Sequence, residues 1–355
     1  MTLSILAIDT SCDETSAAVT QGTTILSNII WSQASLHAKW GGVLPSLAQR
    51  KHRQRIDWVI SRALKAANKK MTDIDAVAVT VGPCLAVAGQ VGIQKAKEIS
   101  IKHHKPFLAV NHLEGHVLSP LALPKSKRLT KKQLPFPAFG LVVSGGHTDL
   151  VKIKQIGQYQ LLATTQDDAL GEALDKAARM LGLGYPGGAI LEKMARKGKD
   201  NKYSLPLPMS GRESEGRFSY SGLKTAMWKL TESEKKNGFL RKSQIENLAW
   251  VFQDKAFEHL IRVIKYQIQK EPAKTLLVGG GVVANTELRK RLRQMVKELN
   301  LRVCLPYSKR LCTDNAAMIG VAAYFKAKRG EYEKEINKVE RVPRLSLDQT
   351  PPWSD

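Results

Sequence analysis

Residues 3–15 read LSILAIDTSCDET, an apolar strand that ends in a polar, acidic turn. Two more strand-like segments follow this turn, and helices and strands then alternate. A meander of strands followed by alternating helices and strands is typical of an α/β unit with a mixed sheet. The expected elements are strands at 3–11, 15–20, 23–31, 75–81 and 107–110, a helix at 44–67, and a second helix opened by GPCLAVAGQVG at 82–92.

The second half of the chain repeats this order. An apolar strand at 136–144 ends in Gly145 and Gly146, and a second meander follows it. The repeat predicts two duplicated α/β lobes. The other expected elements are strands at 147–154, 159–165 and 275–278, and helices at 168–182, 244–270, 284–299 and 315–329.

The repeat also suggests where the chain divides. We expect a first lobe over residues 1–118, joined by the C-terminal helix at 315–330, and a second lobe over residues 119–314. Residues 184–242 are richer in Gly, Pro and polar residues, and we interpret them as an insertion in the second lobe. We interpret residues 331–355 as a peripheral tail.

The composition is that of a globular chain, with 355 residues of which 43% are hydrophobic and 25% charged. No apolar run reaches the roughly 18 residues that a membrane-spanning helix needs. The first residues lack a basic region followed by a long apolar stretch, so no secretory signal is expected. The four cysteines form no CxxC pair, which argues against a zinc finger or disulfide framework and favours the cytoplasm.

The net charge is +23, from 55 Lys and Arg against 32 Asp and Glu. A surplus of this size suits a polyanionic partner, and RNA is favoured over a membrane because no amphipathic anchor is evident. The alternative is a general bias toward lysine with no partner behind it. The basic clusters at 125–132 and 289–297 are the predicted contacts to nucleic-acid phosphates.

Three turns stand where predicted strands end, at residues 8–12, 143–147 and 278–281. Glycine in such a turn lets backbone N–H groups approach a phosphate with no Cβ in the way. Turns at matching places in two half-repeats indicate a nucleotide held between the lobes. A Rossmann site is disfavoured because no G-x-G-x-x-G follows a strand, and the P-loop pattern is absent. His147 beside the second turn either reaches this site or packs as a strand histidine.

The segment NHLEGH at 111–116 places His112 and His116 four residues apart, on one face of a helix. Two imidazoles at this spacing can bind one metal ion, and the alternative is a pair of solvated helix histidines. A zincin has Glu directly after its first His, whereas this chain has Leu113 there, so a metalloprotease is disfavoured. Asp314 is the candidate third ligand, and its alternative role is to cap the helix that follows it.

Eight segments of the chain form an ordered set of motifs. They are IDTSCDET (8–15), SLHAKWGGVLPSLAQRKH (35–52), NHLEGH (111–116), LVVSGGHT (141–148), DDALGEALDKAARMLGLGYPGG (167–188), FSYSGLKTA (218–226), GGGVVANTELR (279–289) and CTDNAAMIG (312–320). In this order they resemble the TsaD family, also known as the Gcp or O-sialoglycoprotein endopeptidase family, over about residues 3–328. The resemblance implies an ASKHA (actin, sugar-kinase and Hsp70) fold, with two duplicated RNase H-like lobes and a nucleotide cleft between them.

The resemblance implies an acyltransferase that moves a threonylcarbamoyl group from threonylcarbamoyl-AMP to N6 of the adenosine directly 3′ of the anticodon, in tRNAs that read ANN codons. It implies one divalent metal per subunit, Fe(2+), on His112, His116 and Asp314. It also implies partners: tRNA, the adenylate, a paralogous ASKHA subunit and a small ATPase. The residues that match the family's active-site acids are Asp13 and Glu14, and those that match its substrate-binding residues are Val142, Val143, Ser144, Gly145, Gly146, Asp175, Gly188, Glu192 and Asn285.

The chain departs from the family pattern in two places. The family usually has GPGLxGxLxVG where this chain has GPCLAVAGQVG, so Cys84 and Val87 replace glycines. The family often has Asp where this chain has Glu192. Two rivals remain: a non-catalytic scaffold subunit of the same fold, which should lack the two histidines and the CTDN segment, and a sugar or acetate kinase, which needs no such metal pair.

Overall fold

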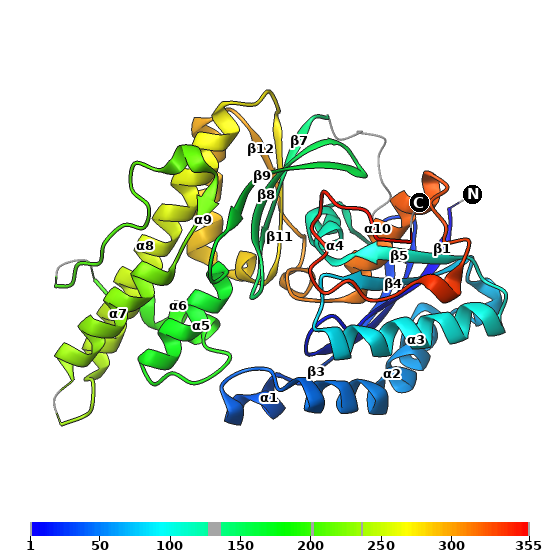
Figure 1. Cartoon of the computed structure of the whole chain (residues 1–355), viewed down its shortest axis with the longest axis horizontal. Coiled ribbons are helices and arrows are strands. Elements are labelled where there is room, and N and C mark those ends of the chain that lie inside the picture. Colours follow the sequence, from blue (N-terminus) through cyan, green and yellow to red (C-terminus); the bar gives the residue numbers. More distant parts are fainter. Residues whose placement is uncertain (1, 127–135, 200–201, 236, 354–355) are drawn as a thin grey trace.

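The computed structural model describes residues 2–126, 136–199, 202–235 and 237–353. They form two six-stranded sheets with helices on the faces of both (Figure 1). Each sheet belongs to one half of the chain, apart from the C-terminal segment, which returns to the first sheet. Among the described residues no helix is both long and apolar enough to cross a membrane.

The first sheet has the strand order β5-β4-β1-β2-β3-β6. It is mixed, because β1 pairs antiparallel with β2 and parallel with β4. Every residue of β1 is buried, with Ile5 on one face and Leu6 on the other, as a central strand covered on both sides requires. The strands are β1 (Ser4–Asp9), β2 (Glu14–Gln21), β3 (Thr24–Ser32), β4 (Ala76–Gly82), β5 (Phe107–Asn111) and β6 (Leu123–Pro124).

The second sheet repeats this topology in the order β10-β9-β8-β7-β11-β12. Its strand β7 pairs antiparallel with β8 and parallel with β11, as β1 does with β2 and β4. Each sheet adds one short parallel strand beside its third strand. The predicted duplication is therefore confirmed. The strands are β7 (Ala138–Val143), β8 (Thr148–Gln155), β9 (Gln158–Thr165), β10 (Arg217–Phe218), β11 (Thr275–Gly279) and β12 (Arg302–Cys304).

The helices complete a stack of five layers (Figure 1). Helices α2 (Pro45–Ala67) and α3 (Ala86–Lys102) cover the outer face of the first sheet, and the short α1 (Ala34–His37) precedes α2. Helices α4 (His112–Leu118) and α10 (Ala316–Lys328) share one apolar cluster with the inner faces of both sheets. The outer face of the second sheet is covered by α5 (Leu170–Met180), α6 (Gly188–Ala195), α7 (Ser221–Glu234), α8 (Lys242–Gln269) and α9 (Thr286–Glu298).

Two segments beyond the repeat pack closely on it. Residues 184–242 supply α6, β10 and α7, and Phe218 and Tyr220 from this segment are buried in the core of the second half. After α10 the chain runs along the first sheet, where the Val342 N–H donates to the Val81 carbonyl at 2.8 Å. As domain boundaries, the ranges given above stay a prediction.

Two glycines let β11 end directly against α4. A Cβ on Gly279 would lie 1.9 Å from the carbonyl oxygen of His116. Gly280 has a φ of +101°, and a Cβ there would lie 2.3 Å from the carbonyl oxygen of Val143. Only glycine fits these two positions, so Gly279 lets the second sheet pack directly on the helix that carries both histidines, and Gly280 lets the turn after β11 pack on β7.

Candidate functional site

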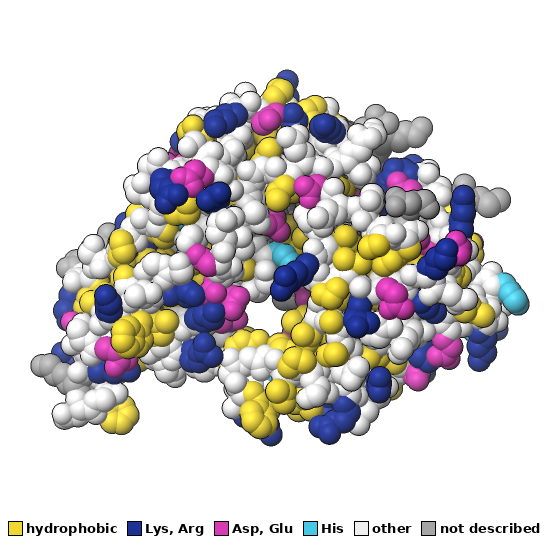
Figure 2. Space-filling model, viewed as in Figure 1, with side chains coloured by type: hydrophobic (Ala, Val, Ile, Leu, Met, Phe, Trp, Pro, Cys, Tyr) yellow, Lys and Arg dark blue, Asp and Glu magenta, His cyan; other side chains and the backbone are white. Residues whose placement is uncertain are grey.

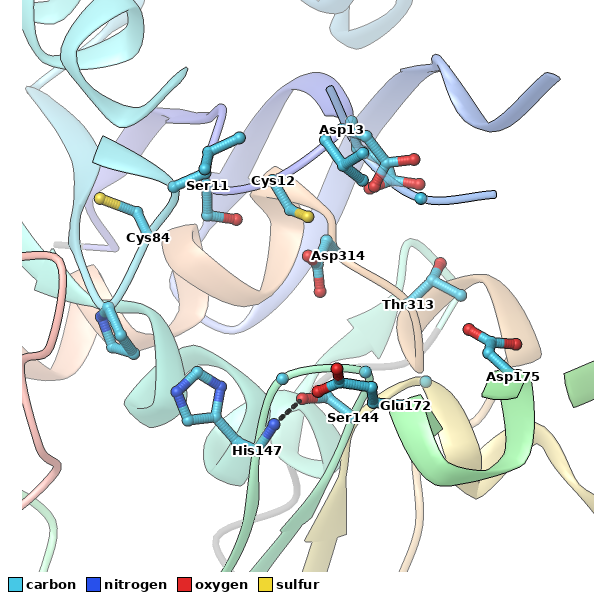
Figure 3. Close-up of a pocket in the computed structure, with 18 of the residues that line it drawn as sticks. Ser11, Cys12, Asp13, Cys84, Ser144, His147, Glu172, Asp175, Thr313 and Asp314 are labelled. Carbon is cyan, nitrogen blue, oxygen red and sulfur yellow. Dashed lines mark hydrogen bonds between the residues drawn. The ribbon is translucent and has the colours of Figure 1, made fainter. Parts of the chain in front are cut away.

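A cavity of about 650 Å³ lies between the two halves of the molecule, and its lining comes from both. Figure 2 shows the molecule hollowed there, and Figure 3 shows Asp314 extending between the turn that carries Cys12 and Asp13 and the turn that carries Ser144. A cavity of this size suits a cofactor or nucleotide. The predicted site residues that line it are Asp13, Glu14, His112, Ser144, Gly145, Gly146, Asp175 and Asp314.

The two histidines lie on α4, which starts at His112 because the Asn111 side chain caps it. The Asn111 Oδ1 accepts the Leu113 N–H at 2.8 Å. The cap of α10 is Asn315, whose Oδ1 accepts the Met318 N–H at 3.2 Å. Since Asn315 performs the capping, the alternative role considered for Asp314 falls away, and its carboxylate is left to face the histidines.

The Nε2 atoms of both histidines face one oxygen of Asp314. The distance to Asp314 Oδ1 is 3.5 Å from His112 and 3.1 Å from His116. A first-row metal with bonds of about 2.0–2.2 Å keeps its donor atoms roughly 3–3.5 Å apart, which the two distances to Asp314 match, and the three donor atoms all lie within 4.8 Å of one another. The group of His112, His116 and Asp314 could therefore hold a metal, and no other group of three such side chains meets that description among the described residues.

The electrostatics of this group favour a cation. Burial opposes ionisation of Asp314, yet the two histidines hold its pKa well below the usual value. Burial lowers the pKa of His116, whereas Asp314 outweighs burial and raises that of His112. The Nδ1 atoms of both rings are buried without a hydrogen-bond partner. A carboxylate beside two buried imidazoles is a donor set that a divalent ion would complete.

Asp9 lies behind this group, and the sequence indicated it only as part of the first turn. It is fully buried at the end of β1, and its Oδ1 lies 3.8 Å from His112 Nδ1. Its Oδ2 has no hydrogen-bond partner. In the sequence, the only sign of a role for Asp9 was an acidic residue at the end of a buried apolar strand. At 3.8 Å Asp9 forms no hydrogen bond with the ring, but together with Asp314 its negative charge raises the pKa of His112 against the effect of burial.

Glu114 points away from both histidines, to the other side of α4. Its Oε1 accepts a hydrogen bond from the Tyr159 hydroxyl at 2.8 Å, and Arg329 lies 3.9 Å away. Burial raises the pKa of Glu114 despite these partners. A metalloprotease needs this glutamate beside the metal as a general base, so the geometry agrees with the exclusion of that class.

The first turn brings Asp13 and Glu14 to the cavity. The Ser32 hydroxyl donates to Glu14 Oε1 at 3.1 Å. Burial, with the nearby carboxylates of Asp13 and Asp314, raises the pKa of Glu14 well above its usual value. The same causes raise the pKa of the Cys12 thiol. The turn thus combines a carboxyl group and a thiol whose pKa values are both raised, because burial and the neighbouring carboxylates disfavour the charged form of each.

A buried hydrogen-bond network holds this turn, and no sequence pattern other than the family segment 35–52 pointed to it. His52 lies on α2, and its Nε2 is 3.0 Å from the Cys12 carbonyl, while its Nδ1 is 2.8 Å from the Thr15 hydroxyl. These partners fix one tautomer, in which Nε2–H donates to the carbonyl and Nδ1 accepts from the hydroxyl. Burial lowers the pKa of His52, which keeps the ring neutral.

The same network reaches the segment 41–44. The Leu44 N–H donates to His37 Nδ1 at 3.2 Å, and His37 Nε2 lies 3.3 Å from Gln33 Oε1. The Gln33 amide in turn lies against His52 and Ala48. Gly41, Gly42 and Val43 line the cavity, so these buried side chains position two parts of its wall.

The second turn opens onto the cavity. A Cβ on Gly145 or Gly146 would meet no atom within 4 Å, so their backbone is accessible to a bound group. The turn is closed by the Ser144 N–H, which donates to the His147 carbonyl at 2.8 Å, and by the His147 N–H, which donates to Ser144 Oγ at 3.1 Å (Figure 3). His147 lines the cavity, and burial lowers its pKa to about 4.

The other predicted substrate-binding residues are not all at the cavity. Asp175 lines it, and its Oδ1 accepts the N–H groups of Gly187 and Gly188 at 2.9 and 2.7 Å. Glu192 Oε1 accepts the Thr286 N–H at 2.9 Å, and Asn285 caps α9. Val142 and Val143 are buried within β7. Five of the predicted residues do not line the cavity and lie instead on β7, on α6 or at the start of α9: Val142, Val143, Gly188, Glu192 and Asn285.

The family model described as TsaD, tRNA N6-adenosine threonylcarbamoyltransferase, matches residues 24–321. Curated proteins of that name from Thermodesulfovibrio yellowstonii and Caldicellulosiruptor saccharolyticus are 43% and 40% identical to this chain. The alignments cover 92% and 97% of this chain and 95% and 98% of those proteins. The chain belongs to the TsaD family.

The fold agrees with this membership. The crystal structure of HypF from T. kodakarensis superposes with a TM-score of 0.60 at 12% identity, over 94% of this chain and 48% of that one. Such a likeness shows the fold alone. The ASKHA fold predicted from the sequence is thereby confirmed.

The departure of the 82–92 segment from the TsaD pattern has a structural explanation. A Cβ on Gly89 would lie 2.5 Å from the Sγ of Cys84. The usual family pattern has Gly at position 84 and Leu at position 89. In this chain the larger residue stands at position 84, as Cys, and the smaller one at position 89, as Gly. The Cys84 thiol occupies space that a larger residue at position 89 would need. Burial raises its pKa to about 12, so the thiol stays neutral.

Several residues that line the cavity were not among the site residues predicted from the sequence. Glu172, Lys176 and Arg179 project from α5 toward the cavity, and Tyr185 follows them. Their helical spacing within the family segment 167–188 was the only available signal. Arg179 Nη1 donates to the Gly41 carbonyl at 3.3 Å, which makes it a contact between the two halves across the cavity.

Of the two basic clusters predicted to contact nucleic acid, the structure describes only the one at 289–297 in full. The cluster at 125–132 lies largely outside the described residues. In the cluster at 289–297, Arg291 pairs with Asp254 at 2.6 Å, and Arg289 Nε donates to the Val283 carbonyl at 2.6 Å. Those two side chains are engaged within the second half. Lys290, Arg293 and Lys297 are the exposed basic residues of α9.

Proposed function

We propose that this protein transfers the threonylcarbamoyl group of threonylcarbamoyl-AMP to N6 of the adenosine directly 3′ of the anticodon in tRNAs that read ANN codons. The observation that carries the proposal is family membership along nearly the whole chain, at 43% identity to a relative of that name. The metal-capable group at the cavity supports a catalytic member over a non-catalytic scaffold, because a scaffold has no need of it.

The reaction needs no covalent intermediate, because the adenylate is already activated. The N6 amine attacks the carbamoyl carbon, a C–N bond forms, the C–O bond to the phosphate breaks, and AMP leaves while the amine loses one proton. Asp13 and Glu14 are the proposed pair beside the attacking amine, with one of them receiving that proton. Open backbone N–H groups at Gly145 and Gly146 suit the charge that develops on the leaving phosphate.

The proposed metal ligands are His112, His116 and Asp314. Two imidazoles and one carboxylate are a ligand set that Fe(2+) accepts with positions left open, and we propose Fe(2+) as the ion. When bound, a divalent ion supplies Lewis-acid polarisation of the substrate's oxygens. The Asn111 and Asn315 caps would hold the segments that carry these ligands, and the buried Asp9 adds negative charge beside His112.

We also propose the partners and the compartment. The protein is proposed to work in the cytoplasm with a paralogous ASKHA subunit and a small ATPase, while a separate enzyme provides the adenylate. Asp175 is proposed to hold the substrate's hydroxyl or amide groups directly, and Val142, Val143, Gly188, Glu192 and Asn285 to shape the site from behind.

The test is reconstitution with purified partners, tRNA and threonylcarbamoyl-AMP, followed by nucleoside analysis of the tRNA. The expected product is N6-threonylcarbamoyladenosine with the wild-type chain. Asp13→Asn and Asp314→Ala should lower the yield strongly, whereas Asp348→Asn, at an exposed acid of the C-terminal segment, should not. Formation of the product in the absence of this chain, or unchanged yields in both site variants, would count against the proposal.

A further inference from the structure

The cavity continues onto a second, shallower hollow between α5 and α7. We call it the α5–α7 surface, and its members are Lys176 and Arg179 from α5 and Ser221, Lys224, Thr225 and Trp228 from α7. Lys176 and Arg179 also line the main cavity, so the two spaces adjoin. Figure 2 shows basic and acidic side chains gathered on the α5 side of the central hollow.

Trp228 stands on the outer face of α7. It is 52% exposed, whereas Leu223 and Met227 on the inner face of the same helix are buried. Ser221 and Thr225 share its exposed face at helical spacing. Its exposed indole lies beside the main cavity, so the ring is accessible to a planar group held there.

The basic residues around Trp228 are held in defined positions. Lys176 and Lys224 both pair with Asp168, the first at 2.9 Å, and Lys176 also pairs with Glu172 at 2.9 Å. The Arg179 guanidinium lies on the boundary between the surface and the cavity, where its Nη1 donates to the Gly41 carbonyl at 3.3 Å. Both lysines are paired with carboxylates, so within the described chain Arg179 is the cation of this surface that forms no ion pair.

The target adenosine lies in a single-stranded loop, and its N6 must reach residues deep in a cavity. The base therefore has to leave its stack, and a neighbouring base then loses one stacking partner. An exposed aromatic ring at the rim replaces that partner for any base, and nearby Arg and Lys side chains suit the flanking phosphates. The α5–α7 surface supplies both.

We propose that the α5–α7 surface binds the nucleotides next to the target adenosine, with Trp228 stacking on an unpaired base and Arg179 contacting a backbone phosphate. This inference rests on the proposed function. It names the part of the substrate that this part of the chain recognises.

The test measures steady-state transfer by the reconstituted complex with the tRNA concentration varied. Trp228→Ala should raise KM for tRNA about 5- to 150-fold, the equivalent of about 1–3 kcal/mol for one stacked base, with kcat within about twofold. Trp228→Phe should keep most of the affinity, because a smaller ring still stacks. The matched control is Trp58→Ala on α2, 48% exposed and outside both hollows, which should leave KM unchanged.

The salt dependence of RNA binding distinguishes the phosphate contact of Arg179 from the stacking contact of Trp228. Binding of a labelled anticodon stem-loop RNA should lose about 0.7 from its log K versus log[salt] slope in Arg179→Gln, and nothing from that slope in Trp228→Ala. An unchanged KM in Trp228→Ala, with normal transfer by the wild type, overturns the inference and leaves the proposed function standing. Loss of complex assembly in Trp228→Ala, with normal KM for the assembled fraction, overturns it in favour of a protein-docking surface. No transfer by the wild type fails the proposed function, and the inference with it.

Discussion

Replacing His52 by alanine should destabilise the protein and disturb the first turn of the cavity. His52 and Thr15 are both fully buried, and the histidine bridges the Thr15 hydroxyl and the Cys12 carbonyl at 2.8 and 3.0 Å. The substitution leaves these two groups without a partner. Each unpaired buried group costs about 1–3 kcal/mol, so we expect a loss of about 2–6 kcal/mol in the free energy of unfolding.

A double-mutant cycle separates the hydrogen bond from the loss of the ring. Thr15→Val alone should cost about 1–3 kcal/mol, because it leaves the imidazole Nδ1 unpaired. In the double variant neither the orphaned hydroxyl nor the unpaired Nδ1 remains, so the two single losses should sum to about 2–6 kcal/mol more than the double variant loses. Urea unfolding followed by fluorescence gives all four stabilities.

His103→Ala is the matched control, since His103 is exposed at the end of α3. It should change stability by no more than about 0.5 kcal/mol. His52→Ala should also lower kcat for transfer more than it raises KM for tRNA, because it acts on the turn that carries Asp13. Equal stabilities of His52→Ala and His103→Ala, or additive losses in the cycle, would refute the reasoning.

Three further predictions follow from single contacts. Asp314→Ala should lose the bound metal measured by elemental analysis, while Asp13→Asn keeps it; equal metal content in both contradicts the ligand assignment. Gly89→Leu should cost about 1–3 kcal/mol by overpacking, and adding Cys84→Gly should recover most of the thermal midpoint; no recovery contradicts the size exchange. Burial lowers the pKa of His259 to about 4. The unfolded chain, with a pKa near 6.5, therefore binds a proton first as pH falls. This histidine should contribute up to about 3 kcal/mol to the loss of stability between these pKa values, and His259→Gln should lose that much less than the wild type over the same range.

Much of the fold could be predicted from the sequence, because hydrophobic periodicity reports which faces are buried. The predicted helix at 244–270 is α8, and the predicted strands at 75–81 and 275–278 are β4 and β11. The boundaries differ by a few residues. The helix expected from 168 starts at Leu170, since Ala169 is still extended.

The candidate site was predictable where its residues stand at a regular local spacing in the sequence. His112 and His116 are one helical turn apart, and that spacing is local. Whether Asp314 caps a helix or faces the histidines depends on Asn315, which takes the cap, and only the structure shows that. The bond from His52 to Cys12 joins residues 40 positions apart with no periodic signal, so no sequence pattern could reveal it.

The central claim is that this chain modifies tRNA with a threonylcarbamoyl group, and nucleoside analysis of tRNA tests it most directly. Total tRNA from cells depleted of this protein is digested and compared with tRNA from cells that carry the wild-type gene or the His116→Ala variant. The account predicts that N6-threonylcarbamoyladenosine disappears on depletion, returns with the wild-type gene, and stays absent with the variant. Undiminished N6-threonylcarbamoyladenosine in the depleted cells would contradict it.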